Sequence, residues 1–216
     1  MTPPPHPSHR GRPHAARVAA ALACALGVLL GLSTGAAHAA HVLSVQAARQ
    51  GSSVSVALRV ALDAPGPALF RALLHYEAMP RYDPELRALR IEATSDPDRV
   101  RLILTIHTCV LFFCKTIHQQ QIMTAHPAPG GGVLQAQFVP ASGAFGGQGR
   151  WVVAPCTPGA SAACLDAHLE LEPHFWVPPM IGPWLIRRKM HEEAVHISEG
   201  LERMAHASGW LQPEIR

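Results

Sequence analysis

The sequence predicts an α+β protein in which an antiparallel sheet packs against one long helix near the C-terminus. Segments between residues 43 and 171 alternate apolar and polar side chains with the period of two that is typical of half-buried strands. One short helical segment, residues 68–74, interrupts them, and residues 184–206 carry a helical repeat. A run of strands followed by a helix favours a helix that covers one face of the sheet.

The long helix is predicted from Trp184 to His206. Pro178, Pro179, Gly182 and Pro183 disfavour a helix before it. A helix of this kind gains little by itself in water, so it needs the sheet as a partner. Its apolar face is expected to contain Ile186, Met190, Ala194, Ile197, Leu201 and Met204, and its other sides Glu192, Glu193, Glu199, Glu202 and Arg203.

The strands follow one another along the middle of the chain. Strands are predicted over residues 43–47, 54–62, 87–94, 100–107, 116–124, 134–138, 150–154 and 165–171, most of them by alternation. Residues 65–67 and 75–84 contain prolines that bound the short helix, whose apolar side includes Leu69 and Phe70. Residues 127–132 are expected to form a loop, and residues 146–149 a flexible glycine-rich connection.

The first 39 residues have the pattern of an export signal. Arg10, Arg12 and Arg17 precede an uncharged apolar run, residues 18–32, and small residues then lead to Ala39. A basic region, an apolar region and an Ala-x-Ala site predict a signal peptide, cleaved after Ala39. A membrane anchor is the alternative, but the apolar run is short for a span. The product is then a periplasmic protein with one domain, residues 40–216.

Charge gives no support for a nucleic-acid partner. The chain has 18 Lys+Arg and 15 Asp+Glu, and the three arginines of the export signal account for the whole excess. The remainder is balanced, whereas a domain that binds nucleic acid usually carries a basic surface.

Four cysteines remain after the predicted cleavage: Cys109, Cys114, Cys156 and Cys164. An even number in an exported chain favours disulfides, and four cysteines allow three pairings. Cys109–Cys114 and Cys156–Cys164 are favoured because each pair flanks a predicted turn. Neither spacing is that of a zinc-binding CxxC pair, so no metal site is expected.

No motif predicts catalysis or a cofactor. His191 and His196 are five residues apart, whereas a zinc-protease helix needs a spacing of four. The chain has no Gly-x-Ser-x-Gly motif, and residues 146–149 lack the lysine of a phosphate-binding loop. His168, Glu170 and Glu172 share the polar face of their strand, which predicts a solvated exterior. We therefore assign no catalytic residue, metal ligand or cofactor.

Three segments resemble the START-like, helix-grip (SRPBCC) superfamily, which includes polyketide cyclase/dehydrase and coenzyme Q-binding START-domain proteins. Residues 63–80 resemble its opening, which is a pause, a short helix and then Tyr76-Glu77-Ala78-Met79-Pro80. Residues 169–173 resemble its last strand, and residues 175–179 with the final helix resemble its close. The likeness covers about residues 53–207. It implies a helix-grip fold, with a curved antiparallel sheet wrapped around the C-terminal helix and a short helix after the first strand.

Such folds hold an apolar cavity between helix and sheet, so the resemblance implies binding or transport of a lipid or another hydrophobic small molecule. Residues 175–185 are rich in Trp, Phe and Pro, and could contact a membrane surface or act as a packed cap. Tyr82 and Asp83 could orient a head group or cap a turn. The candidate ligand-binding residues are Tyr82, Leu104, Ile106, Leu134, Phe138, Trp151, Leu169, Trp184, Ile197 and Leu201.

Two other functions compete with this carrier hypothesis. An aromatase/cyclase-like enzyme would act on a polyketide or aryl substrate, but it needs a general acid or base inside the cavity. The predicted inward faces contain almost no such group. An interaction module with a filled core is the third hypothesis, because sequence does not determine whether apolar side chains enclose a cavity.

Overall fold

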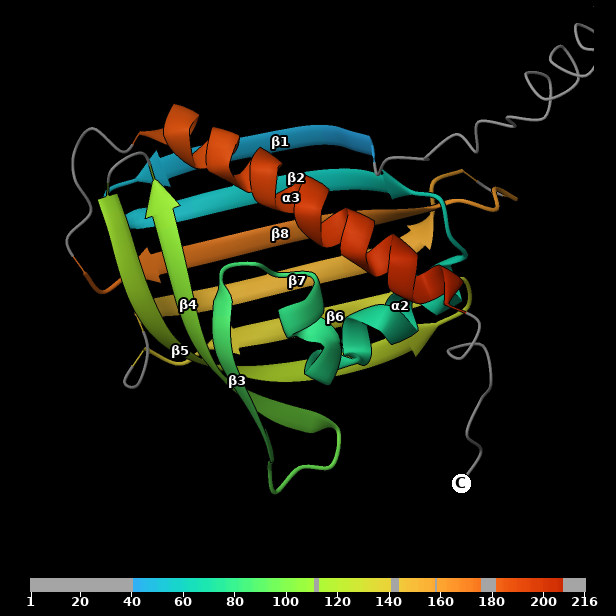
Figure 1. The fold of residues 1–216 in the computed structure, drawn as a ribbon, viewed down its shortest axis with the longest axis horizontal. Helices are drawn as coiled ribbons and strands as arrows, with labels where there is room; N and C mark the ends of the chain where they lie inside the picture. The colour runs from blue at the N-terminus through green and yellow to red at the C-terminus, as the bar shows by residue number, and fades with distance from the viewer. Residues whose placement is uncertain (1–40, 111–112, 141–143, 158, 176–181, 208–216) are drawn as a thin grey trace, which may run out of the picture. The chain divides into compact units, whose positions relative to one another are not determined.

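Most of residues 41–207 belong to a single antiparallel sheet (Figure 1). The computed structural model describes residues 41–110, 113–140, 144–157, 159–175 and 182–207. The chain divides into two units, Met1–His38 and Ala39–Arg216, and every described residue belongs to the second. The predicted export signal lies outside the described residues, so it stays a prediction.

The sheet has eight strands in the order β1-β2-β8-β7-β6-β5-β4-β3. Strand β2, from the beginning of the domain, pairs with β8, the last strand, and every other neighbouring pair is consecutive in the sequence. The strands are β1 (His41–Gln50), β2 (Ser53–Leu62), β3 (Leu86–Ala93), β4 (Arg99–Val110), β5 (Phe113–Ala128), β6 (Gly131–Phe138), β7 (Phe145–Pro155) and β8 (Ala163–Pro173).

Two α-helices and a 3₁₀ helix lie on one face of this sheet. They are α2 (Gly66–Leu74), η1 (Tyr76–Arg81) and α3 (Pro183–His206), and α3 crosses the strands along its length (Figure 1). The alternation along β8 follows from this arrangement: Leu165 and Ala167 are buried, whereas His168 and Glu170 are exposed. The predicted α+β architecture, a curved sheet with a helix packed across it, is therefore confirmed.

The core lies between α2, α3, η1 and the inner face of the sheet. On α3, Ala194 and Leu201 of the predicted stripe are buried, and Ile197 and Met204 are half-buried. A large apolar side chain contributes about 1.5–3 kcal/mol when it is fully buried, so this stripe holds the helix on the sheet. None of the described helices is long and apolar enough to cross a membrane.

Two glutamates of α3 differ from the prediction, because Glu193 and Glu202 are buried rather than solvated. Each has a polar partner that makes its burial tolerable. Lys189 Nζ lies 2.6 Å from Glu193 Oε1, and the backbone N–H of Asp63 donates to Glu202 Oε1 over 2.8 Å. The helical repeat marked only the apolar part of the buried face.

The prediction of a flexible connection at residues 146–149 is wrong, since all four residues belong to β7. Strands on both sides hold this stretch: Gly149 pairs with Ala136 of β6 and with Leu169 of β8. At Gly147 the backbone is left-handed, with φ of +112°, and a β-carbon would overlap the backbone of Glu170. The glycines thus permit close strand contact. The loop predicted at residues 127–132 is also shorter, because β5 runs to Ala128 and β6 begins at Gly131.

Candidate ligand cavity

An apolar cavity of about 210 Å³ lies between the first turns of α3 and the inner face of the sheet. Strands β2 and β8 form one side, and the ends of β4 and β5 form another. The lining residues are Val54, Val56, Thr108, Val110, Phe113, Lys115, Ile117, Phe145, Leu171, Pro173, Phe175, Ile186, Lys189 and Met190.

The β4–β5 hairpin supplies the cavity wall through its alternation. Thr108 pairs with Lys115, and Val110 pairs with Phe113, so all four side chains lie on the same side of the hairpin and line the cavity. The pair between them, Cys109 and Cys114, points to the opposite side, where it forms a disulfide with a Cα–Cα distance of 4.0 Å. The bond therefore ties together the two strand ends that carry this wall.

Both predicted disulfides are confirmed. Cys109–Cys114 joins β4 to β5, and Cys156–Cys164 joins the end of β7 to the start of β8 with a Cα–Cα distance of 4.8 Å. Each bond closes a short connection between consecutive strands, which is why the spacing of the cysteines around predicted turns was sufficient to pair them.

A charged triad lies beside the cavity. Lys189 lines the cavity, and its Nζ lies 2.6 Å from both Glu85 Oε1 and Glu193 Oε1. Burial alone would lower the pKa of Lys189, but its hydrogen bonds with Glu193 and Glu85 outweigh burial and hold that pKa above its usual value. The ammonium is thus kept charged and paired, and it is a poor proton acceptor for any bound molecule.

Aromatic side chains fix another side of the cavity. The rings of Phe145 and Phe175 meet edge to face, with centroids 5.4 Å apart and planes at 75°. Lys115 Nζ lies 4.4 Å from the centroid of the Phe175 ring, within the range of a cation–π contact. Phe175 is the last described residue before residues 176–181, so most of the predicted apolar segment 175–185 lies outside the described residues.

Tyr82 and Asp83, the predicted head-group residues, lie where η1 meets α3. Asp83 Oδ1 accepts hydrogen bonds from the backbone N–H groups of Glu85 (2.9 Å) and Leu86 (3.2 Å), so Asp83 caps a turn. Burial raises the pKa of the Asp83 carboxyl above its ordinary value. Tyr82 is buried in the core, and burial raises the pKa of its hydroxyl and that of Tyr76, the latter to about 12.

The predicted ligand-binding residues are in the core or on the surface, and none of them is among the lining residues of this cavity. Their part in binding stays a prediction. Trp184 is 60% exposed. The core contains Tyr82, Leu104, Leu134, Phe138 and Leu201, with Ile106, Trp151, Leu169 and Ile197 half-buried against it.

The residues that do line the cavity were partly visible in the sequence. Val54, Val56 and Leu171 belong to inward faces that alternation predicted, but they lie toward one end of the sheet rather than at its middle. Sequence reasoning missed the residues of the β4–β5 hairpin and two others: Thr108, Val110, Phe113, Lys115, Ile117, Phe145 and Lys189. Ile186 could have indicated this location of the cavity from the sequence. It is the first residue of the predicted apolar stripe of α3, and it lines the cavity.

Exposed apolar residues mark a shallow groove on the opposite side of α3. Trp184 and Leu43 of β1, which are 60% and 50% exposed, both line this groove. Arg187 and Arg188 lie in the same groove, and Arg188 Nε pairs with Glu192 Oε1 at 3.0 Å. The groove therefore combines two large apolar side chains with two guanidinium groups, one of which is paired with the carboxylate of Glu192.

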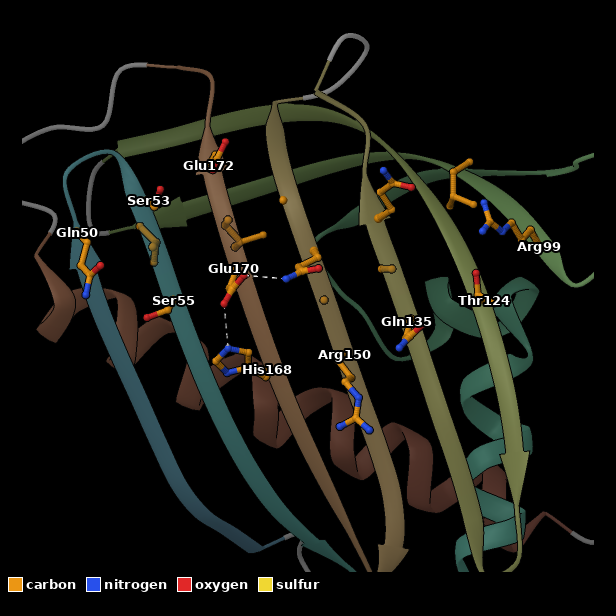
Figure 2. A pocket seen from close by; sticks show the side chains of 18 residues that line it. Gln50, Ser53, Ser55, Arg99, Thr124, Gln135, Arg150, His168, Glu170 and Glu172 are labelled. Atoms are coloured by element: carbon orange, nitrogen blue, oxygen red, sulfur yellow. Dashed lines mark hydrogen bonds and ion pairs between the residues drawn. The ribbon is translucent and has the colours of Figure 1, made fainter. Parts of the chain in front are cut away.

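A larger hollow, of about 950 Å³, lies on the outer face of the sheet, with α3 behind it (Figure 2). Its side chains are mostly polar and face solvent, as predicted for His168, Glu170 and Glu172. Glu170 accepts a hydrogen bond from Gln148 Nε2 over 2.8 Å. This bond lowers the pKa of Glu170, and a hydrogen bond from His168 lowers it by a smaller amount. Water can satisfy such groups, so we take the smaller cavity, whose lining is almost entirely apolar, as the candidate site.

Comparison with known proteins gives matches only in structure. No protein-family model matches the sequence, and no curated protein matches it. The Zhui aromatase/cyclase from Streptomyces sp. R1128 has a TM-score of 0.54 at 12% identity, over 70% of this chain and 93% of that one.

Two further solved structures are similar to this chain. Human STARD10 has a TM-score of 0.53 at 8% identity, over 84% of this chain and 77% of that one. The STAR-related lipid transfer protein from Xanthomonas axonopodis has a TM-score of 0.51 at 13% identity, over 74% and 98%. At these identities the likeness shows that the fold is the same.

Proposed function

We propose that this chain, which has the START-like helix-grip fold, binds a lipid or another hydrophobic small molecule in the cavity between α3 and the sheet. The observation that carries the proposal is the composition of the cavity wall. Apart from Thr108, Lys115 and Lys189, every lining residue is apolar. A ligand would be held mainly by burial of its apolar surface, which contributes about 25 cal/mol per Å².

The volume of the cavity indicates the size of ligand that it holds. An engineered cavity of about 150 Å³ in another protein binds benzene, and sites for drug-sized ligands measure about 300–1,000 Å³. At about 210 Å³ the cavity accommodates one or two small rings or part of an acyl chain. A longer lipid would leave the rest of its chain outside or would need the cavity wall to move.

A carrier fits the cavity better than an aromatase/cyclase-like enzyme does. Among the described residues, the lining contains no carboxylate and no histidine, the usual general acids and bases. Its two titratable groups are lysines, and Lys189 is held in the charged form by Glu85 and Glu193. The similarity to the Zhui aromatase/cyclase is one of fold.

Export to the periplasm is part of the same proposal. The basic and apolar pattern of residues 1–39 supports it, and two disulfides are the kind of bond that persists in an oxidising compartment. N-terminal sequencing of protein from a periplasmic extract is expected to begin at Ala40. Recovery of a membrane-bound chain that retains Met1 would contradict this part.

We also place a membrane-contact surface at the groove of Trp184, Leu43, Arg187 and Arg188. An anionic lipid surface is its occupant in this proposal, because the guanidinium groups complement lipid phosphates and the exposed apolar groups can enter the interface. Trp184→Ala should weaken sedimentation with anionic vesicles at least threefold and leave the denaturant midpoint nearly unchanged. Equal sedimentation of wild type and variant would exclude this surface.

The central experiment fills the cavity. Val56, which is 1% exposed, lines it, so Val56→Phe should remove space for a ligand. Val152→Phe is the matched control, because Val152 lies on the outer face of the sheet in β7 and pairs with Asp166. Thermal shifts with single-ring and fused-ring hydrocarbons and medium-chain alcohols measure binding, since a ligand at 100 times its Kd stabilises by about 2.7 kcal/mol.

We expect the wild type and Val152→Phe to be stabilised by at least one of these probes and Val56→Phe to lose most of that stabilisation while remaining folded. Native mass spectrometry of the purified protein would then identify any hydrophobic molecule that co-purifies. If no apolar probe stabilises the wild type, the proposal gives way to an interaction module with a filled core.

A further inference from the structure

The outer face of the β4–β5 hairpin contains a cluster that the cavity does not use. Cys109 and Cys114 are directly paired across the two strands, and His107 precedes Cys109 by two residues on the same side of β4. His107 Nε2 lies 4.0 Å from Cys109 Sγ. The donor atoms of the three residues all lie within 4.8 Å of one another. No other group of three such residues is this close within the part of the chain that the structure describes.

We propose that the reduced form of this hairpin binds a soft d¹⁰ metal cation through His107 Nε2, Cys109 Sγ and Cys114 Sγ. In the disulfide form the two sulfurs are bonded to each other, and neither is a thiolate ligand. Two molecules of a low-molecular-weight thiol reduce the disulfide to two cysteine thiols, through a mixed disulfide, and are themselves joined in a disulfide. Metal binding then displaces one proton from each thiol. The proposal does not depend on the cavity or on its ligand.

The spacing of His107 and Cys109 already suits such a cation, whereas the two sulfurs must move after reduction. Zinc is bound at about 2.3 Å by sulfur and about 2.0 Å by histidine nitrogen, so in a tetrahedral site a sulfur and a nitrogen ligand lie about 3.5 Å apart. The 4.0 Å between His107 Nε2 and Cys109 Sγ needs to shorten by only a few tenths of an ångström. After reduction the two sulfurs must separate, and side-chain rotation of a directly opposed cross-strand pair allows this.

A second observation concerns the other nitrogen of the same ring. His107 Nδ1 lies 3.1 Å from Thr116 Oγ1, its cross-strand partner. With Nδ1–H donating to that hydroxyl, Nε2 keeps its lone pair on the side of the cysteines. Metal-binding histidines commonly have their second nitrogen fixed in this way, which sets the tautomer and the ring orientation. Thr116 is therefore a positioning residue for His107.

The ligand set selects the class of cation. Two thiolates and one imidazole favour soft or borderline d¹⁰ ions, such as Zn²⁺, Cd²⁺ and Cu⁺, over the hard ions Mg²⁺ and Ca²⁺. Three protein ligands leave a fourth position for water or an external ligand. The sequence did not suggest this site, because the ligands follow the pattern His-x-Cys-x₄-Cys, and it is the cross-strand pairing that brings them together.

The test uses the full chain with Cys24, Cys156 and Cys164 replaced by serine, so that only the hairpin cysteines remain. Cd²⁺ is titrated anaerobically into the protein reduced with a phosphine, and cadmium–thiolate charge-transfer absorption and the protons released are measured. We expect one Cd²⁺ per reduced chain with two protons released, and no such absorption from the oxidised chain. Mg²⁺ at tenfold excess should not compete.

His107→Gln and His118→Gln form the matched pair. His118 lies on the same face of the hairpin and its Nδ1 contacts Thr105 Oγ1 at 3.2 Å, but it is not in the cluster. We expect His107→Gln to weaken Cd²⁺ binding at least tenfold and His118→Gln to change it less than twofold. If the serine-substituted chain does not fold, the same two histidine substitutions are compared in the chain with all five cysteines. The amount of metal that stays bound to the hairpin is then the quantity measured. Equal effects of the two substitutions, or no stoichiometric Cd²⁺ in the reduced chain, would overturn the proposal.

Discussion

Gly200 on α3 lies directly against Tyr82, the residue that follows η1, so that a β-carbon at position 200 would overlap the β-carbon of Tyr82. The contact lets the helix approach η1 closely and buries Tyr82. A glycine inside a helix costs about 1 kcal/mol relative to alanine, so the close approach must outweigh that cost.

The first prediction follows from this contact. Gly200→Ala should lower the free energy of unfolding by about 1–3 kcal/mol, because overpacking at a rigid β-carbon exceeds the gain in helix propensity. Gly182→Ala is the control at the other end of α3, where a β-carbon meets nothing within 4 Å. Denaturant midpoints measure both. A stabilised Gly200→Ala variant would show that α3 and η1 are not in close contact.

The second prediction concerns pH. Burial raises the pKa of Asp83, so the folded protein favours its protonated form, and the stability that this provides is present below the unfolded pKa and is lost as pH rises through the folded pKa. Asp83→Asn keeps an oxygen for the N–H groups of Glu85 and Leu86 and carries no charge. Its Tm should exceed that of wild type at pH 7.

This difference should shrink toward zero as the pH falls below the ordinary range for aspartate. Asp98→Asn, in an exposed turn, reports the general effect of removing a carboxylate. Asp83→Asn could instead lose the same amount of stability at both ends of the pH range. That result would mean that the hydrogen bonds of the carboxylate outweigh the cost of its burial.

The third prediction separates a partly buried ion pair from an exposed one on adjacent residues. Lys189→Met keeps an apolar stem against the cavity but leaves Glu85 and Glu193 without their ammonium partner. It should cost about 1–3 kcal/mol, the range for removing a partner from a buried polar group. Arg188→Met breaks the exposed pair with Glu192 and should cost less than about 1 kcal/mol. Combining Lys189→Met with Glu85→Gln should recover part of the loss.

The fourth prediction concerns the disulfides. Peptide mapping of the oxidised protein should recover Cys109 linked to Cys114 and Cys156 linked to Cys164. Replacing either pair with serine should cost about 2 kcal/mol, because both loops are short and loop entropy grows only slowly with length. A peptide that joins Cys109 to Cys156 would contradict the strand pairing of β4 with β5.

The sequence was sufficient for the architecture because the strongest patterns are periodic. Alternation located each strand, and the spacing of Ile186, Met190, Ala194 and Leu201 located α3 to within one residue of its start. The glycines of β7 were misassigned because local composition does not include the hydrogen bonds that β6 and β8 supply. Tertiary pairing there overrides a weak local preference for strand.

The candidate site was harder to predict than the fold. Val56 and Leu171 could be placed on inward faces, but alternation does not distinguish a side chain that fills the core from one that borders a cavity. Glu193 was assigned to solvent because its partner, Lys189, is an ordinary helix-surface residue by pattern. Whether these groups are buried depends on the position that α3 takes against the sheet. That position is determined by tertiary packing.

The pairing of β2 with β8 also has a consequence for how the chain folds. Val54 is aligned with Leu171, more than a hundred residues later, whereas the other strand pairs join neighbours in the sequence. Closing so long a loop costs entropy before any contact repays it, so this pairing should come late and slow the overall rate. The β1–β2 hairpin and the hairpins from β3 to β8 can form as the chain emerges, but the pairing of β2 with β8 must wait until β8 has been made. Until then β2 has one unpaired edge, and this makes the nascent chain dependent on protection against aggregation.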